Sequence, residues 1–282
     1  MTSKRILILG NLSRPEVAVQ VGTLEKWIAQ QCKLIAVLPT NEPLNDNLGK
    51  IDLCVVCGGD GTILAAARLL AGTNVPIMGV NMGKLGFLAE YNVEHMQKHF
   101  EDVLTDKIQP TERIMLDVTI NNCSQHSFTS PAANDVAISA GSPFRLIDLD
   151  VSRGDETIAR YAGDGLVVST PTGSTGYNMS AGGPLIERTL DAVAITPIAP
   201  HSLALRPILV NANQPIKINM VRINEGTEVI IDGQIHSSLC EGDTVEIRRA
   251  EAPMRVIPHP GRGFFKVLSE KLKWGISPHH GE

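Results

Sequence analysis

Apolar runs and amphipathic segments alternate through the first hundred residues. Short apolar runs predict strands, and apolar positions spaced three and four residues apart predict helices. Ser13 is the expected cap of the first helix, with Pro15 in its first turn. The predicted strands are Arg5–Gly10, Lys33–Leu38, Ile51–Cys57 and Val75–Val80, and the predicted helices are Pro15–Gln31, Thr62–Ala71 and Val93–Thr105. This alternation is typical of a parallel sheet with crossover helices, so we expect an α/β domain.

The pattern changes near Pro110, beyond which apolar and polar residues alternate in short segments. The predicted strands are Met115–Ile120, Ala132–Ile138, Leu146–Ser152, Thr157–Tyr161, Gly165–Ser169, Ile216–Met220, Glu228–Ile231 and Thr244–Arg248. Helix is expected only around Thr175–Ala181 and in the tail, at Phe264–Trp274. We therefore expect an α/β domain over residues 1–112 and an all-β, sandwich-like domain over residues 113–259. Residues 260–282 are expected to return and pack on the first domain.

The composition narrows the range of partners. Hydrophobic residues make up 43% of the 282 residues and the formal net charge is -5. An acidic chain without Lys or Arg runs is not expected to bind nucleic acid, and the absence of an apolar run of about eighteen residues predicts no membrane span. Five scattered cysteines suit a reducing compartment, so we expect a cytoplasmic protein.

Two pairs of possible metal or redox ligands have simpler interpretations. Cys54 and Cys57 form a CxxC pattern, but they lie in a predicted buried strand, where a spacing of three directs the two thiols to opposite faces. We interpret them as core thiols. His95 and His99 are four residues apart on a predicted helix and could hold a metal ion. Without a nearby Glu or Cys to complete a site, a solvated helix face is favoured.

The segment Gly58-Gly59-Asp60-Gly61-Thr62 follows a predicted buried strand and opens a helix. Glycines allow backbone N–H groups to approach an anion, and a helix N-terminus favours negative charge. A carboxylate at such a turn suits proton acceptance from a hydroxyl, or contact with a Mg²⁺ ion that bridges phosphates. The alternative is a plain strand-to-helix turn in which Asp60 caps the helix.

A second chemically rich segment is Asp164–Pro184, which contains the sequence TPTGSTGYNMSAGGP. A predicted strand leads here into a dense set of hydroxyls, glycines and one tyrosine. Such a set offers hydrogen-bond partners and an aromatic ring to a nucleoside. By composition alone, an ordinary Ser- and Gly-rich loop is equally consistent with it.

Together these segments closely resemble the NAD kinase family. The resemblance also covers Asn81–Leu88 (NMGKLGFL), Asn134-Asp135, Pro200–Leu203 with Arg206-Pro207, and Asp232–Gln234, all in the family's order. The GGDGT segment alone is shared with diacylglycerol and sphingosine kinases and, loosely, with phosphofructokinases. The TPTGSTGYNMSAGGP segment is much more specific.

The resemblance implies an enzyme that transfers a phosphoryl group from ATP, or possibly polyphosphate, to the adenosine-ribose 2′-hydroxyl of NAD, forming NADP. It implies that Asp60 is catalytic, that Gly59, Gly61 and Thr62 lie by the phosphates, and that Asp164 holds the nicotinamide end. Further NAD or nucleotide contacts are implied for Asn134, Asp135, Arg145, Thr175, Gly176, Tyr177, Asn178, Met179, Ser180 and Gln234. It also implies Mg²⁺ or another divalent cation, without protein metal ligands that we can assign, and a homo-oligomer, either dimer or tetramer.

Three positions depart from the family's pattern. Asp135 stands where Glu is usual, Gly176 where Ala is common, and Ala162 where some members carry Arg. Two alternatives stay open: a lipid kinase of the diacylglycerol or sphingosine type, and a sensor that binds NAD(P) without chemistry. The intact Asp60 disfavours the sensor, and the polar Asp164–Pro184 segment disfavours the lipid kinase.

Overall fold

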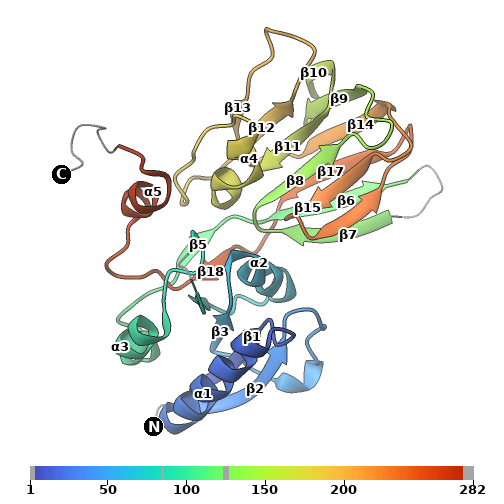
Figure 1. Cartoon of the computed structure of the whole chain (residues 1–282). Helices are drawn as coiled ribbons and strands as arrows, with labels where there is room; N and C mark the ends of the chain where they lie inside the picture. The colour runs from blue at the N-terminus through green and yellow to red at the C-terminus, as the bar shows by residue number, and fades with distance from the viewer. Residues whose placement is uncertain (1–3, 84–85, 123–126, 276–282) are drawn as a thin grey trace. The chain divides into compact units, whose positions relative to one another are not determined.

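The structure is a computed structural model that describes residues 4–83, 86–122 and 127–275. Lys84 and Leu85 of the NMGKLGFL segment lie outside these residues. The chain divides into two compact units, one formed by Met1–Glu112 with Arg255–Glu282 and the other by Arg113–Met254 (Figure 1). The predicted fold class, an α/β part followed by an all-β part and a final helix, is confirmed.

The first unit is built around a six-stranded sheet in the order β2-β1-β3-β4-β18-β5. Its strands are β1 (Arg5–Gly10), β2 (Lys33–Pro39), β3 (Leu53–Cys57), β4 (Ile77–Val80), β5 (Thr111–Arg113) and β18 (Met254–Val256). Its helices are α1 (Pro15–Gln31), η1 (Asp46–Leu48), α2 (Asp60–Leu69), α3 (Val93–Leu104) and α5 (Phe264–Leu272). The pairs β1–β2, β1–β3, β3–β4 and β4–β18 are parallel, as the strand–helix alternation predicts.

Burial explains why these segments form this sheet. All five residues of β3 are buried, which suits a parallel strand covered on both faces. The helices contribute Val21, Leu24 and Phe100 to the same core. The predicted cap at Ser13 is wrong: α1 begins after Arg14 without a side-chain cap, and the Ser13 hydroxyl bonds to Asn11 instead.

The second unit contains two six-stranded sheets that share one hydrophobic core. One sheet, in the order β10-β9-β14-β17-β6-β7, holds β6 (Leu116–Asn121), β7 (Ser127–Ala132), β9 (Ile147–Arg153), β10 (Glu156–Gly163), β14 (Ile216–Arg222) and β17 (Thr244–Arg249). The other, in the order β13-β12-β11-β8-β15-β16, holds β8 (Asp135–Ser139), β11 (Gly165–Ser169), β12 (Ala192–Ile198), β13 (Ile208–Asn211), β15 (Glu228–Ile231) and β16 (Ile235–Ser238). The pairings within both sheets are antiparallel, and buried and exposed residues alternate along β6.

Among the described residues of this unit, helix is confined to η2 (Thr172–Thr175) and α4 (Tyr177–Ser180), close to where the sequence predicts a turn or two. The predicted strand Ala132–Ile138 is correct only from Asp135, since Asp135–Ile138 lie in β8. Ala132 is the last residue of β7, which belongs to the other sheet, and Ala133-Asn134 separate the two strands. None of the described helices combines the length and the apolar character needed to cross a membrane.

Candidate active site

The turn between β3 and α2 places Asp60 at the carboxyl edge of the first unit's sheet. The Gly58 N–H donates to the Val80 carbonyl at 2.9 Å, which ties the turn to the end of β4. The Thr62 side chain lies directly over Gly58, where an added Cβ would come within 2.3 Å of its hydroxyl. Gly59 is the N-cap of α2, so the first N–H groups of the helix follow it at Asp60 and Gly61. This is the geometry of an anion-binding turn.

The Asp60 carboxylate accepts three hydrogen bonds from backbone amides of a distant loop. Its Oδ2 accepts from Phe87 at 2.8 Å, and its Oδ1 accepts from Leu88 at 2.9 Å and from Ala89 at 3.0 Å. Since α2 has no side-chain cap, the capping interpretation of Asp60 is wrong. A carboxylate oxygen has about two lone-pair positions, so Oδ1 is full and Oδ2 keeps one.

Gly86 makes this contact possible because it leaves room for the carboxylate. A Cβ at Gly86 would lie 2.0 Å from Asp60 Oδ1 and 2.5 Å from the carboxyl carbon. The side chain of Asp60 therefore packs directly on the backbone of residue 86. This loop fixes the direction in which the carboxylate faces.

In the second unit, the break between β7 and β8 is organised by Asp232. The Asp232 carboxylate accepts the N–H groups of Ala133 at 3.1 Å, Asn134 at 2.7 Å and Asp135 at 3.2 Å. The Asp232 N–H in turn donates to the Asp135 carbonyl at 2.9 Å. These bonds replace the strand ladder at the break. They fix the dipeptide Asn134-Asp135 at one end of β8.

Asp135 and Asn134 present unusual polar groups at this break. Burial and, to a lesser extent, the nearby Asp232 carboxylate raise the pKa of Asp135 to about 7. The Asn134 Oδ1 is buried and has no hydrogen-bond partner in the described part of the chain. Gly176 lies beside both, since a Cβ there would come within 3.7 Å of Asp135 Oδ2 and 3.9 Å of Asn134 Nδ2.

The segment after β11 folds into η2 and α4 around a buried polar core. The Asn178 side chain is fully buried; its amide nitrogen donates to the Pro184 carbonyl at 2.9 Å, and its oxygen accepts from Thr196 Oγ1 at 2.7 Å. Both ends of the Asn178 amide are thus occupied by partners within this unit. Tyr177, by contrast, is 40% exposed, and Ser180 is also exposed.

Most of the predicted nucleotide-binding residues of this unit gather at one end of the sheet that contains β11. Asp135 pairs with Ser169 at the end of β11, and Ile231 pairs with Val136, so three segments meet there. They carry Asn134 and Asp135, the residues 175–180, and Gln234. The sheet register therefore brings together positions that are up to a hundred residues apart in the chain.

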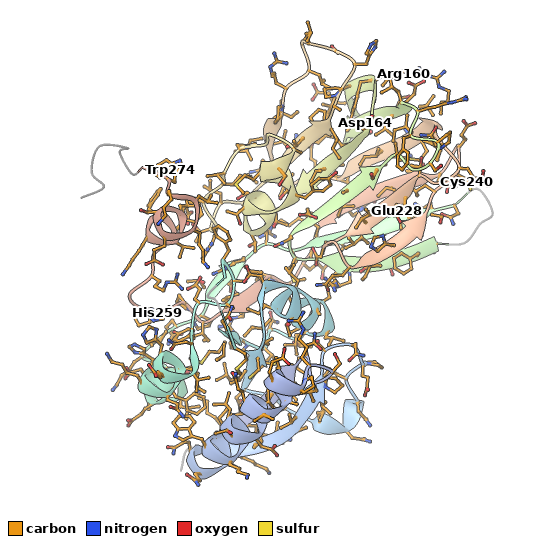
Figure 2. The ribbon with its side chains drawn as sticks, viewed as in Figure 1. Arg160, Asp164, Glu228, Cys240, His259 and Trp274 are labelled. Atoms are coloured by element: carbon orange, nitrogen blue, oxygen red, sulfur yellow. The ribbon has the colours of Figure 1, made fainter. Side chains whose placement is uncertain are left out.

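Arg145 and Asp164 lie at the opposite end of the same sheet. Asp164 is exposed and immediately precedes β11 (Figure 2). Its carbonyl accepts the Ala140 N–H at 2.8 Å, in the loop that continues to the exposed Arg145. The five residues of β11 separate them from the other group by roughly 17 Å at the usual rise per residue.

The cysteine and histidine pairs have structural environments. Cys54 and Cys57 are buried free thiols, as predicted, and burial raises the pKa of Cys57 to about 12. His95 and His99 do not form a fully solvated face, because both rings are half-buried and pack against His259, which is labelled in Figure 2. The His259 Nδ1 accepts the Gly261 N–H at 3.0 Å, so the neutral ring carries its proton on Nε2, 3.2 Å from His95 Nδ1. Within the described ranges, no three His, Cys, Asp or Glu residues are arranged to hold a metal ion.

Comparisons with known proteins identify the family. The model of the ATP-NAD kinase N-terminal domain matches residues 23–108, and that of the ATP-NAD kinase C-terminal domain matches residues 133–259. The NAD kinase of Trichlorobacter lovleyi is 42% identical over 227 residues, which cover 80% of each chain. The chain belongs to the NAD kinase family. As an NAD kinase it is an enzyme, which decides against the lipid-kinase and sensor alternatives.

Two solved structures share the fold of this NAD kinase. An NAD kinase from Archaeoglobus fulgidus in complex with ATP superimposes with a TM-score of 0.74 at 26% identity, covering 94% of this chain and 99% of that chain. A yeast NADH kinase complexed with NADH gives a TM-score of 0.87 at 22% identity, covering 100% of this chain and 90% of that chain. The second likeness concerns the fold alone.

The structure adds roles that the sequence analysis of this NAD kinase missed. Asp232 was part of the family resemblance, but its carboxylate organises the Asn134-Asp135 break. Gly86 and the amides of residues 87–89 hold Asp60. The contact with Asp60 could have been suspected from Gly86, which stands between two apolar residues in KLGFL, since an isolated glycine often marks a close backbone approach.

Proposed function

We propose that Asp60 is the proton acceptor in the transfer of the γ-phosphoryl group from ATP to the adenosine-ribose 2′-hydroxyl of NAD. The 2′-oxygen forms a bond to the γ-phosphorus while the bond to the β–γ bridging oxygen breaks, which gives NADP and ADP. The hydroxyl proton passes to Asp60 Oδ2. Oδ1 already accepts two N–H groups, whereas Oδ2 accepts one and keeps a lone pair.

The same turn supplies groups for the phosphates. Gly59, Gly61 and Thr62 lie at the N-terminus of α2, where the helix dipole favours the negative charge of phosphate oxygens. Mg²⁺ neutralises phosphate charge when it is bound. It typically binds in large part through substrate phosphates and water, so an ion that arrives with ATP needs few protein ligands.

The gathered residues of the second unit are proposed to hold NAD. The unpartnered Asn134 Oδ1 is an acceptor for a ribose hydroxyl or an amino group. The exposed Tyr177 ring offers a flat apolar surface to a base or ribose. We propose that Asp135, Thr175, Gly176, Met179, Ser180 and Gln234 complete this surface.

We further propose that the chain works as a cytoplasmic homo-oligomer. Asp164 and Arg145 are separated from the other NAD residues by the length of β11. In a homo-oligomer, Asp164 of one copy can contact a dinucleotide that is bound to another copy. This would explain why Asp164 lies a full strand length away from the other NAD residues of its own chain. The buried free thiols of Cys32, Cys54 and Cys57 suit the reducing cytoplasm.

The proposed reaction is tested by incubating the purified protein with NAD, ATP and Mg²⁺ and by detecting the product with an NADP-specific dehydrogenase. That dehydrogenase responds only to dinucleotide phosphorylated at the 2′ position. A steady, enzyme-dependent signal is expected. Consumption of ATP without dehydrogenase-active product would overturn the assignment of the acceptor hydroxyl.

A further inference from the structure

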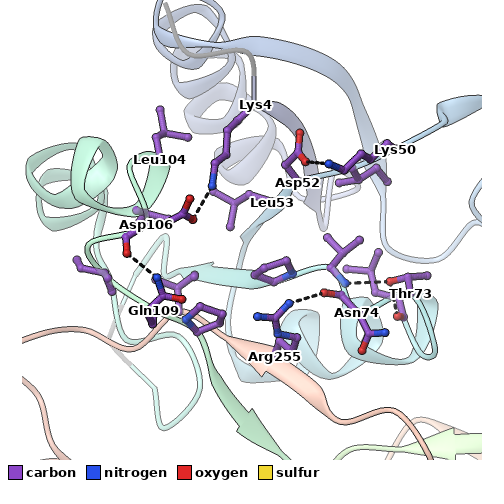
Figure 3. A pocket seen from close by; sticks show the side chains of 18 of the residues that line it. Lys4, Lys50, Asp52, Leu53, Thr73, Asn74, Leu104, Asp106, Gln109 and Arg255 are labelled. Atoms are coloured by element: carbon purple, nitrogen blue, oxygen red, sulfur yellow. Dashed lines mark hydrogen bonds and ion pairs between the residues drawn. The ribbon is translucent and has the colours of Figure 1, made fainter.

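The first unit contains a cavity of about 540 Å³ at the amino edge of its sheet (Figure 3). Lys4, which precedes β1, Leu53 at the start of β3 and Pro76 before β4 line it. The phosphate turn lies at the other end of β3 and β4. The cavity is therefore separate from the turn that carries Asp60.

The cavity has the composition of a ligand site. Its volume falls within the range of about 300–1,000 Å³ that is usual for small-molecule sites. Apolar side chains from the sheet and the neighbouring helices line much of it, namely Leu53, Leu70, Val103, Leu104, Ile108 and Ile257. Such a lining suits the apolar body of a small organic molecule.

The charged side chains that line the cavity leave one positive charge uncompensated. Lys4 Nζ pairs with Asp106 Oδ1 at 2.5 Å, and Lys50 Nζ pairs with Asp52 Oδ1 at 3.0 Å (Figure 3). Arg255 is the remaining charged residue of the lining, and it has no carboxylate partner among the described residues. A singly charged anion would restore neutrality.

The Arg255 guanidinium makes one hydrogen bond to the chain and keeps a buried donor without a partner among the described residues. Its Nη1 donates to the Asn74 carbonyl at 3.3 Å, whereas its Nε is buried without a hydrogen-bond partner in the described part of the chain. Arg255 lies on β18, which pairs with β4 through Val256 and Ile77, so the strand holds its backbone. An arginine side chain stays protonated and presents a planar fork that matches a carboxylate.

We propose that this cavity binds a small organic monocarboxylate, with the carboxylate on Arg255 and the apolar body against Leu53 and Ile257. The site does not depend on the proposed reaction. Its ligand is defined by one negative charge and an apolar body, which distinguishes it from the multiply charged nucleotides expected at the phosphate turn.

The proposal is tested with benzoate and hexanoate as probes, and with benzyl alcohol as the neutral match for benzoate. Saturable benzoate binding is measured by calorimetry and mapped by amide chemical shifts in the full chain. We expect Arg255→Gln to weaken benzoate binding by about tenfold or more, and to leave the weaker binding of benzyl alcohol unchanged. Arg160→Gln, an exposed arginine paired with Asp150 in the second unit, should bind benzoate like the wild type.

Arg255→Lys keeps the positive charge but removes the planar guanidinium fork. Its affinity for benzoate should therefore lie between those of the wild type and Arg255→Gln. Shifts are expected at residues 49–53, 70–76 and 104–110. The proposal is overturned if neither carboxylate binds saturably, if Arg255→Gln binds benzoate as the wild type does, or if the shifts fall at Gly58–Thr62. A melting temperature for each variant establishes that the variant is folded.

Discussion

At the scale of single residues, the three aspartates of the candidate site differ in their surroundings. Asp60 and Asp232 each accept three backbone N–H groups, which fix the direction in which each carboxylate faces. Asp135 is buried beside Asp232, and these surroundings raise its pKa. One residue type therefore forms a backbone anchor at Asp232 and a group that titrates near neutral pH at Asp135, and we propose it as the proton acceptor at Asp60.

Gly86→Ala tests the contact that orients Asp60. The new methyl group would lie 2.0 Å from Asp60 Oδ1, so the carboxylate or the loop must move. We expect kcat to fall by about 10²-fold or more, because misplacing a catalytic group by about 1 Å can cost that much. The kcat of each variant is measured from steady-state NADP formation. Gly83→Ala is the matched control, since a Cβ there would be 3.7 Å from Asn81 and should be tolerated. Equal activity of both variants would contradict the contact.

Asp135→Asn tests the titration of the buried carboxyl. The folded-state pKa is raised to about 7, so the unfolded chain releases this proton at lower pH than the folded chain does. The free energy of unfolding of the wild type should therefore fall as the pH rises from about 4 to about 7. Asp135→Asn should reduce this fall, as measured by urea unfolding at several pH values. Asp164→Asn, which changes an exposed carboxyl, should leave the fall in the free energy of unfolding as it is in the wild type. An unaltered pH dependence in Asp135→Asn would refute the role of burial.

At the scale of elements, the sequence predicts local patterns well and long-range partners poorly. The buried run of β3 and the alternation of β6 are visible in the chain, and both strands were predicted. The break at Ala133-Asn134 was missed because the carboxylate that replaces the strand ladder is 98 residues away from Asn134. β12 was missed although it is almost wholly buried, and it contains Pro197, which argues against a strand.

In the candidate site, too, the sequence reveals local patterns but not long-range partners. The turn at Gly58–Thr62 was recognisable because its glycines and carboxylate are contiguous. The contacts of Asp60 with residues 87–89 depend on the loop after β4; Gly86 signals a close backbone approach there, but the sequence does not say which side chain approaches. The burial of Asn178 beside the exposed Tyr177 and Ser180 was likewise not visible in the sequence, because short helical turns direct adjacent side chains to different sides.

The length of β11 leads to a test of the proposed homo-oligomer. The Asp60 and the Asp164 that act on one bound dinucleotide would then belong to two different copies of the chain. In that case an inactive Asp60→Asn chain and an inactive Asp164→Asn chain should complement each other. A one-to-one mixture of Asp60→Asn and Asp164→Asn chains, assembled together, should recover about a quarter of the wild-type sites in a two-fold symmetric dimer. Each variant assembled alone is the control. Mixed assemblies that stay as inactive as the separate variants would show that one chain supplies both residues.

At the scale of the whole molecule, the two units have different chemistry. The first unit carries the phosphate turn at one edge of its sheet and the Arg255 cavity at the other. The second unit carries a polar surface that β8, β11 and β15 assemble from segments distant in sequence. Family membership accounts for the presence of both units.

The central claim is that Asp60 accepts the proton of the 2′-hydroxyl. It is tested most directly by the single-turnover rate of NADP formation in Asp60→Asn, with NAD affinity and melting temperature measured on the same sample. We predict a rate about 10²–10⁴-fold below that of the wild type, because the amide cannot accept the proton, while NAD affinity changes only a few-fold. A folded Asp60→Asn protein that forms NADP within a few-fold of the wild-type rate would contradict the account.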